Sequence, residues 1–237
     1  MKILAVDTAT EACSAALYIE GEIEELFEIA PQQHTRLILN MVEKLLNQAD
    51  IKLNQLDALA FGRGPGSFTG VRIATGVVQG LAYATDLPVV PVSTLASMAQ
   101  FIYQQHQHEK VLSGIDARMG GMYWGSYQLA DNGLMELVDK EQVSAPEAVV
   151  LADNGQWTGA GTAWASYEGQ LVKGLSGSIT HQYPDCLPHS GSIAELAAYA
   201  HSQGQSVPAA QAQPVYLRDD VAKKSKAGGQ QMNAKKR

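Results

Sequence analysis

The residues best suited to chemistry form a glycine-rich segment, GRGPGSFTG, at residues 62–70. It follows a short apolar run at 58–61 that predicts a buried strand, and it precedes a proline-free helical pattern over 71–84. A strand, a glycine-rich bend and a helix N-terminus together present several backbone N–H groups to one point, which suits a phosphate. The candidate phosphate- or nucleotide-binding residues of this segment are Gly64, Gly66, Ser67, Thr69 and Gly70. A tight turn whose glycines serve geometry alone explains the segment equally well, and no lysine stands where a P-loop requires one.

A second polar group ends the first predicted strand, at residues 3–7. Asp7, Thr8 and Thr10 lie where ligands gather in open α/β sheets, so they are candidates for a phosphate or for the water shell of a metal. The alternative is an Asp/Thr turn whose side chains satisfy their own backbone. If the two segments face each other, a nucleotide is the ligand we expect between them.

Charge is distributed unevenly along the 237 residues, which carry a net charge of −7. Residues 221–237 hold six of the 17 basic residues and no acidic one, so the rest of the chain has 11 basic against 24 acidic residues, a net charge of −13. An acidic body argues against broad binding of a phosphate backbone. The basic end is either a solvated terminus or a contact for RNA or an acidic partner.

Cysteine content and hydropathy exclude two further classes of protein. Cys13 and Cys186 are too few for a disulfide framework and lack the spacing of a zinc site. The sequence starts directly with a strand pattern, and no apolar stretch has the length of a membrane span. We therefore expect a cytoplasmic protein that does not associate with membranes.

The predicted elements occur in two halves of similar order. The first half has strands at 3–7, 13–19 and 22–29, a helix at 35–49, a strand at 58–61, a helix at 71–84, a strand at 89–92 and a helix at 94–104. After a polar segment at 104–110 there follow strands at 111–115, 122–129 and 134–138, a helix at 145–152, a strand at 156–161 and a helix at 192–202. Residues 165–190 show no clear pattern, and Ser192 with Glu195 predicts a capping box. This order predicts an α/β fold with mixed sheets, duplicated along the chain.

Three segments resemble the TsaB (YeaZ) family, over essentially the whole chain up to residue 221. They are ILAVDTAT at 3–10, GPGSFTGVRI at 64–73 and PVYLR at 214–218. The resemblance implies the actin-like ATPase fold of sugar kinases, heat-shock proteins and actin, with two duplicated domains, each a mixed sheet flanked by helices. The expected domains are residues 1–104, with helices that bind a partner, and the smaller 105–206, followed by an extended segment and basic tail at 207–237.

The same resemblance implies that no catalytic site and no metal site is present. The catalytic paralogue, TsaD, carries a metal-binding His-x-x-x-His shortly after a Pro-Val pair, and the matching positions here are Thr94 and Met98. A hydroxyl and a thioether make a poor site for a hard or borderline divalent cation. The paralogue's second glycine-rich nucleotide loop is reduced to residues 159–161. We expect no resident cofactor. Binding of ATP or ADP at a subunit interface is the alternative that the sequence leaves open.

Two helices provide a candidate contact surface. In the helix at 71–84, small residues follow Arg72 at intervals of four, and such a stripe lets another helix approach closely unless a helix of the same domain already covers it. The helix at 35–49 is apolar over more than one face, which is typical of an association site. The predicted partner-contact residues are Leu37, Ile38, Met41, Leu45, Arg72, Gly76, Val77, Gly80, Leu81 and Ala84. The family resemblance implies a heterodimer with TsaD through these helices, or a homodimer in its absence.

The resemblance thus implies a non-catalytic scaffold that binds TsaD and supports transfer of threonylcarbamoyl to N6 of adenosine 37 in tRNA. It also implies that TsaE, an ATPase, joins the larger complex and that tRNA is contacted only indirectly. An ATP-dependent kinase or acyltransferase of the actin-like superfamily is the alternative, and a peptidase is a weaker one.

Overall fold

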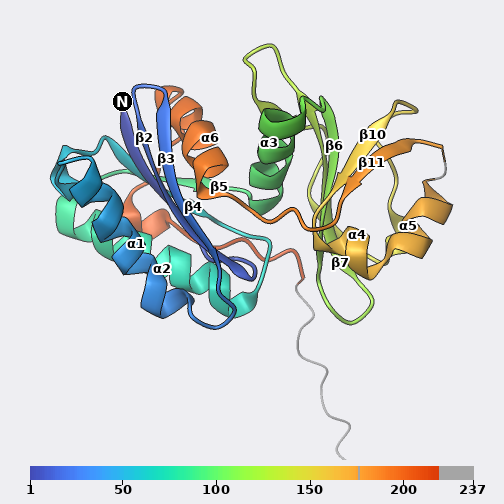
Figure 1. Ribbon diagram of the computed structural model, residues 1–237, viewed down its shortest axis with the longest axis horizontal. Helices are drawn as coiled ribbons and strands as arrows, with labels where there is room; N and C mark the ends of the chain where they lie inside the picture. Colours follow the sequence, from blue (N-terminus) through green and yellow to red (C-terminus); the bar gives the residue numbers. More distant parts are fainter. Residues whose placement is uncertain (176, 219–237) are drawn as a thin grey trace, which may run out of the picture.

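The computed structural model describes residues 1–175 and 177–218, which form two lobes placed side by side (Figure 1). The first lobe contains a five-stranded sheet. Its strand order is β3 (Glu22–Ile29), β2 (Ala12–Ile19), β1 (Lys2–Asp7), β4 (Ala58–Gly62) and β5 (Val89–Val92). The strands β1 to β3 pair antiparallel, whereas β4 and β5 continue the sheet in parallel. The sheet is therefore mixed, as the sequence predicts.

The second lobe repeats this strand order. Its sheet runs β8 (Met135–Leu137), β7 (Met122–Leu129), β6 (Lys110–Asp116), β10 (Trp157–Ala160) and β11 (Ile179–Tyr183), and β9 (Gln142–Ser144) also pairs with β7. Strands β6 and β7 pair antiparallel, and β10 and β11 add in parallel. The predicted duplication is confirmed by this matching order.

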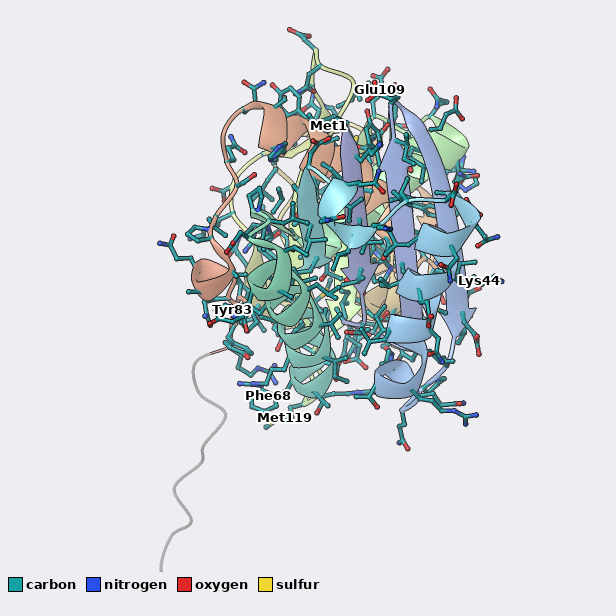
Figure 2. The ribbon with its side chains drawn as sticks, turned by 90° about the vertical axis from the view of Figure 1, so that its left-hand side faces the viewer. Met1, Lys44, Phe68, Tyr83, Glu109 and Met119 are labelled. Carbon is teal, nitrogen blue, oxygen red and sulfur yellow. The ribbon has the colours of Figure 1, made fainter. Side chains whose placement is uncertain are left out.

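Helices cover both faces of the first sheet because its central strands are apolar on both sides. In β1, Leu4 and Val6 belong to the core under α1 (His34–Gln48) and α2 (Phe68–Thr85). Ile3 and Ala5 belong to the core under α6 (Ser190–Ser202), on the opposite face. Figure 2 shows α1 and α2 lying next to each other in front of the strands.

The second sheet is covered in the same way. Helix α3 (Thr94–His106) packs on one face around Leu95 and Met98. The short helices α4 (Thr162–Ser166) and α5 (Glu168–Gly174) pack on the other face around Trp164 and Leu171. Three single 3-10 turns complete the elements, at Leu53–Gln55, Pro146–Ala148 and Ala209–Gln211. Among the described residues, no helix is both long and apolar enough to cross a membrane.

The chain is shared between the lobes differently from the predicted division at residues 104 and 206. Helix α3, predicted in the first domain, packs on β6, β7 and β8 of the second lobe, and α6, predicted in the second, packs on β1 and β2 of the first. In Figure 1, α6 lies beside the N-terminal strands although it comes from the C-terminal part of the chain. The reason is that an amphipathic helix must bury its apolar face, but its sequence does not say against which sheet.

Three local predictions for the second half also differ from the structure. The helix expected at 145–152 is only the 3-10 turn Pro146–Ala148, and the segment without a pattern holds α5 and β11. The capping box does not form, because α6 begins at Ser190 and Ser192 already lies in the first turn. The Ser192 hydroxyl donates to Gln104 instead, at 2.8 Å, and Glu195 accepts from the amides of Gln100 and Gln104.

The C-terminal segment links the two lobes. Residue Val207 forms a bridge to β5, and the Val215 N–H donates to the Arg63 carbonyl at 2.8 Å. Arg218 then donates from Nη1 to the Ala117 carbonyl, at 3.0 Å, in the turn between β6 and β7. Residues 207–215 thus run along the first lobe, and Arg218 contacts the second lobe. The basic residues of the predicted tail lie outside the described residues.

Candidate functional site

A cleft of about 730 Å³ lies between the two lobes. The first lobe contributes the β1–β2 turn and the start of α2, and the second lobe contributes the β6–β7 turn and α4. Its polar and aromatic lining includes Thr10, Glu11, His34, Ser67, Phe68, Asp116, Arg118, Tyr123, Thr162, Ser166, Tyr216 and Arg218. The two hairpin turns that face each other here occupy equivalent places in the duplicated sheets.

The glycine-rich segment packs directly on the β1–β2 turn. The Ser67 N–H donates to the Ala9 carbonyl at 2.7 Å, and the Thr8 hydroxyl donates to the Gly70 carbonyl at 2.7 Å. A Cβ on Gly66 would lie 2.5 Å from the Ala9 carbonyl oxygen, and one on Gly70 would lie 2.0 Å from that of Thr8. These glycines are therefore required by the close approach of two backbones, and this structural role is the one that the contacts support.

Asp7 does not face the cleft. Its side chain is buried beside Gly62, and its Oδ1 accepts from the Ala9 N–H at 2.9 Å. Burial, and to a smaller extent the charge of Glu25, raise the pKa of Asp7 from 3.8 to about 7, although the Ala9 hydrogen bond opposes them. Only Thr10, Gly66 and Ser67 of the predicted phosphate-binding residues line the cleft, whereas Asp7, Thr8, Gly64, Thr69 and Gly70 do not.

The opposite wall contains site residues that the sequence predictions missed. The Asp116 carboxylate accepts from the Arg118 N–H, the Tyr167 hydroxyl and the Ser166 hydroxyl, and these partners together with the charge of Arg118 lower its pKa against the effect of burial. Arg118 and Met119, in the same turn, adopt left-handed conformations with φ of 60° and 55°. Such values are uncommon outside glycine and cluster at functional sites. The sequence signal that could have indicated this second wall is the strand–turn–strand unit at 111–129, which repeats the first unit of the chain.

The two positions that the family resemblance matches to metal-binding histidines of the catalytic paralogue are closed. Thr94 and Met98 are both fully buried in α3. The methyl group of Met98 lies 2.1 Å from where a Cβ on Gly161 would stand, so the reduced glycine segment accommodates this side chain. Within residues 1–175 and 177–218, no three histidine, cysteine or acidic side chains form a group suited to a metal ion. A resident metal therefore does not fit the residues present at this position.

Helix α2 exposes the predicted small-residue stripe. Arg72, Gly76, Gly80 and Ala84 are all exposed, and none of the described residues lies within 4 Å of a Cβ placed on either glycine. Within the part of the chain that the structure describes, no helix of the same lobe covers the stripe, although the sequence left that packing open as the alternative. Tyr83, next to it, is 86% exposed and was missed by the prediction. Val77 and Leu81 are half-buried at the edge of the core.

The predicted contact residues of α1 are mostly interior. Ile38, Met41 and Leu45 are buried in the core beneath α1, so they are not available to a partner, and only the half-buried Leu37 stays at the surface. The helix rests on two sheet strands and on α2 at once, and a wider apolar face is needed for this packing. The excess apolar surface that suggested association is used inside the lobe. Leu39, 51% exposed, is the large apolar side chain that α1 leaves in solvent.

Comparison with known proteins identifies the family of this chain. A family model described as "TsaD: tRNA N6-adenosine threonylcarbamoyltransferase" matches residues 27–226. The "tRNA threonylcarbamoyladenosine biosynthesis protein TsaB" of Escherichia coli K12 is 42% identical over 231 residues, which cover 96% of this chain and 99% of the relative. The chain belongs to the TsaB family. The protein of the same description from Haemophilus influenzae is 40% identical over 236 residues, covering 96% and 98% of the two chains.

The solved structure of YeaZ from Pseudomonas aeruginosa has a TM-score of 0.86 and 46% identity, covering 91% of this chain and 99% of that one. The predicted actin-like α/β fold, with two mixed sheets flanked by helices, is thereby confirmed. Transferases align over less: that of Chlorobium phaeobacteroides is 30% identical over 126 residues, 46% of this chain and 36% of its own. This TsaB family member therefore shares a fold with the transferases.

Proposed function

We propose that this TsaB family member is a non-catalytic subunit that binds a TsaD-type transferase. In that complex it supports transfer of threonylcarbamoyl to N6 of adenosine 37 in tRNA. One observation carries the proposal: Thr94 and Met98, which the family resemblance matches to the metal ligands of the paralogue, are fully buried, while a helix face made of small residues is open to solvent. A chain without the metal pocket contributes to the reaction through a surface.

The open face of α2 has the features of a helix-packing surface. Gly76 and Gly80 allow a second helix to approach to short interaxial distance, because no Cβ separates the backbones. Tyr83 projects beside them with 86% of its surface exposed, and tyrosine is enriched among residues that dominate binding energy. Leu37 of α1 and Val77 and Leu81 of α2, all half-buried against the same core cluster, add apolar surface. A partner helix is the occupant that such a stripe accommodates.

The same face offers a contact for a second copy of the chain when the transferase is absent. We propose that the homodimer and the heterodimer compete for α2, since both would use Gly76 and Gly80. An ATPase of the TsaE type and the tRNA join through the transferase complex. Any ATP or ADP is expected at the subunit interface, because Asp7 and Thr8 are turned away from the cleft of the isolated chain.

The decisive experiment measures heterodimer formation with a charged side chain on the stripe. Gly80→Glu replaces an exposed helical glycine, so the fold is expected to be kept or stabilised by up to about 1 kcal/mol. Close helix packing is blocked, and the affinity for the transferase should fall by about tenfold or more. Gly169→Glu is the matched control, because Gly169 is also helical, exposed and free of neighbours, but lies in α5 of the other lobe.

Isothermal titration and light scattering give the affinity and the oligomeric state of each variant. If Gly80→Glu binds the transferase as tightly as Gly169→Glu does, the interface lies elsewhere. Reconstitution of tRNA modification tests the remaining claim. Modification by this chain alone, or by the transferase equally well without it, would contradict the role of a non-catalytic subunit, and micromolar binding of Mg-ATP by the isolated chain would favour the enzymatic alternative.

A further inference from the structure

Six residues gather at the mouth of the cleft and form what we call the arginine–aromatic rim: Phe68, Arg72, Arg118, Met119, Tyr216 and Arg218. They come from the start of α2, from the β6–β7 turn and from the C-terminal segment. Phe68, Arg118, Met119, Tyr216 and Arg218 line the cleft, and Arg72 contacts both aromatic rings. Figure 2 shows the labelled Phe68 and Met119 close together at the same end of the molecule. The two lobes and the terminal segment thus meet at one surface.

The aromatic part of the rim is held in an exposed arrangement. The Arg72 guanidinium lies 3.3 Å from the centre of the Phe68 ring and 4.9 Å from that of Tyr216, and its Nη1 donates to the Phe68 carbonyl at 3.0 Å. Nevertheless Phe68 remains 63% exposed and Tyr216 42% exposed. Large aromatic side chains are costly to leave in water unless they contact a partner. Both rings keep surface on which a further planar group can stack.

The charged part of the rim is a local exception on an acidic protein. Three arginines stand here, while the chain up to residue 220 has 11 basic against 24 acidic residues. Asp116 is the nearby carboxylate on the second wall. It accepts from the Arg118 N–H, Tyr167 and Ser166, and its Oδ2 also pairs with Arg118 Nη1 at 3.3 Å, in an ion pair whose arginine side chain is largely exposed. Glu11 is the acidic residue on the first wall. The left-handed backbone at Arg118 and Met119 projects both side chains into solvent, with 80% of the Arg118 side chain and 79% of Met119 exposed.

We infer that the arginine–aromatic rim binds a short single-stranded segment of RNA. Exposed rings beside arginines are the combination that recognises unpaired nucleotides, because bases stack on the rings and phosphates pair with the guanidinium groups. A duplex does not fit this chemistry, since its bases are already stacked and the overall negative charge of the protein repels a long phosphate backbone. The inference goes beyond the proposed function, because it requires no transferase and makes this chain a direct contact for RNA.

The test is fluorescence anisotropy of a labelled single-stranded octaribonucleotide with the full-length chain alone, in low salt. Tyr216→Ala should weaken binding about fivefold or more, the loss expected for one stacked base. Tyr199→Ala is the matched control, because Tyr199 is 41% exposed but lies on α6 away from the rim. Arg118→Gln should reduce the dependence of affinity on salt, with a slope lower by about one. Phe68→Ala serves as the second stacking variant if Tyr216→Ala does not fold.

Three results would overturn the inference. The first is affinity of Tyr216→Ala and Phe68→Ala within twofold of the unchanged chain. The second is equal affinity for the duplex of the same sequence. The third is complete loss of binding in Lys223→Gln/Lys224→Gln/Lys226→Gln, which would assign the RNA contact to the basic end of the chain. Because the transferase is absent from these measurements, failure here is distinct from failure of the proposed heterodimer.

Discussion

The carboxylate of Asp7 lies directly over Gly62, so that a Cβ on Gly62 would fall 1.7 Å from Oδ2. The two residues end the neighbouring parallel strands β1 and β4. Among the described residues, Oδ2 is buried and has no hydrogen-bond partner. A buried, half-satisfied carboxylate destabilises the fold when it is ionised, and burial is the main reason that the pKa of Asp7 is raised to about 7.

Asp7→Asn should therefore change how stability depends on pH. An acid whose pKa is raised in the folded state stabilises the fold most below its unfolded pKa and loses this contribution as pH rises through its folded pKa. Between pH 5 and pH 7 the unchanged protein should lose about 2 kcal/mol of unfolding free energy relative to Asp7→Asn. Urea unfolding at several pH values measures the difference. Asp131→Asn, on an exposed turn, is the control, and parallel pH curves for all three proteins would contradict the assignment.

Two glycine substitutions should separate close backbone packing from open surface. In Gly70→Ala the new methyl group would meet the Thr8 carbonyl oxygen at 2.0 Å, so the glycine-rich segment must move off the β1–β2 turn. A loss of about 3 kcal/mol or more is expected. In Gly76→Ala the new methyl group meets none of the described residues within 4 Å, and it should stabilise the helix by about 0.5–1 kcal/mol. Thermal unfolding compares the two variants. Equal midpoints would show that the contact of Gly70 with the Thr8 carbonyl accommodates a methyl group.

Introducing histidines at positions 94 and 98 should not create a metal site. Thr94→His/Met98→His places two imidazoles at positions that are fully buried in a packed core, where Met98 already contacts Gly161. Overpacking and unpartnered polar atoms should lower stability by about 3 kcal/mol or more, with no binding of zinc or iron. Metal analysis after dialysis, together with urea unfolding, gives both quantities. Stoichiometric metal in a variant of normal stability would mean that a pocket persists there.

A buried charged contact between the lobes should contribute to stability. Glu141 accepts from the Tyr127 hydroxyl at 2.6 Å and pairs with Arg63 of the first lobe at 3.4 Å, with 6% of its side chain exposed. Glu141→Gln leaves Arg63 without its counter-charge, and a loss of about 1–3 kcal/mol is expected. Glu136→Gln, on the exposed part of β8, is the control. Urea unfolding at neutral pH decides between them, and equal free energies would show that the pair adds nothing.

Elements whose signals are local could be predicted from the sequence. The glycine-rich bend, its strand and α2 follow from residues that are adjacent in the chain, and the duplicated strand order follows from hydrophobic periodicity. The membership of α3 and α6 depends on contacts between distant segments, which periodicity does not encode. The sequence shows that the apolar face of α1 is wide, which led to its interpretation as an association surface. It does not show that this face packs on two strands and on α2. Asp116 and Arg118 could be recognised as site residues only from the structure, in which the β6–β7 turn faces the β1–β2 turn.

The return of α6 to the first lobe has a consequence for synthesis of the protein. Residues 190–202 cover the sheet face formed by Ile3, Ala5, Ala58 and Ala60, so this face stays bare until nearly the whole chain has left the ribosome. Exposed apolar sheet is prone to aggregate, and translation at about 5–20 residues per second leaves it uncovered for many seconds. A nascent chain halted before residue 190 would carry all five strands of the first sheet with one side unprotected, which makes it a natural client for a chaperone.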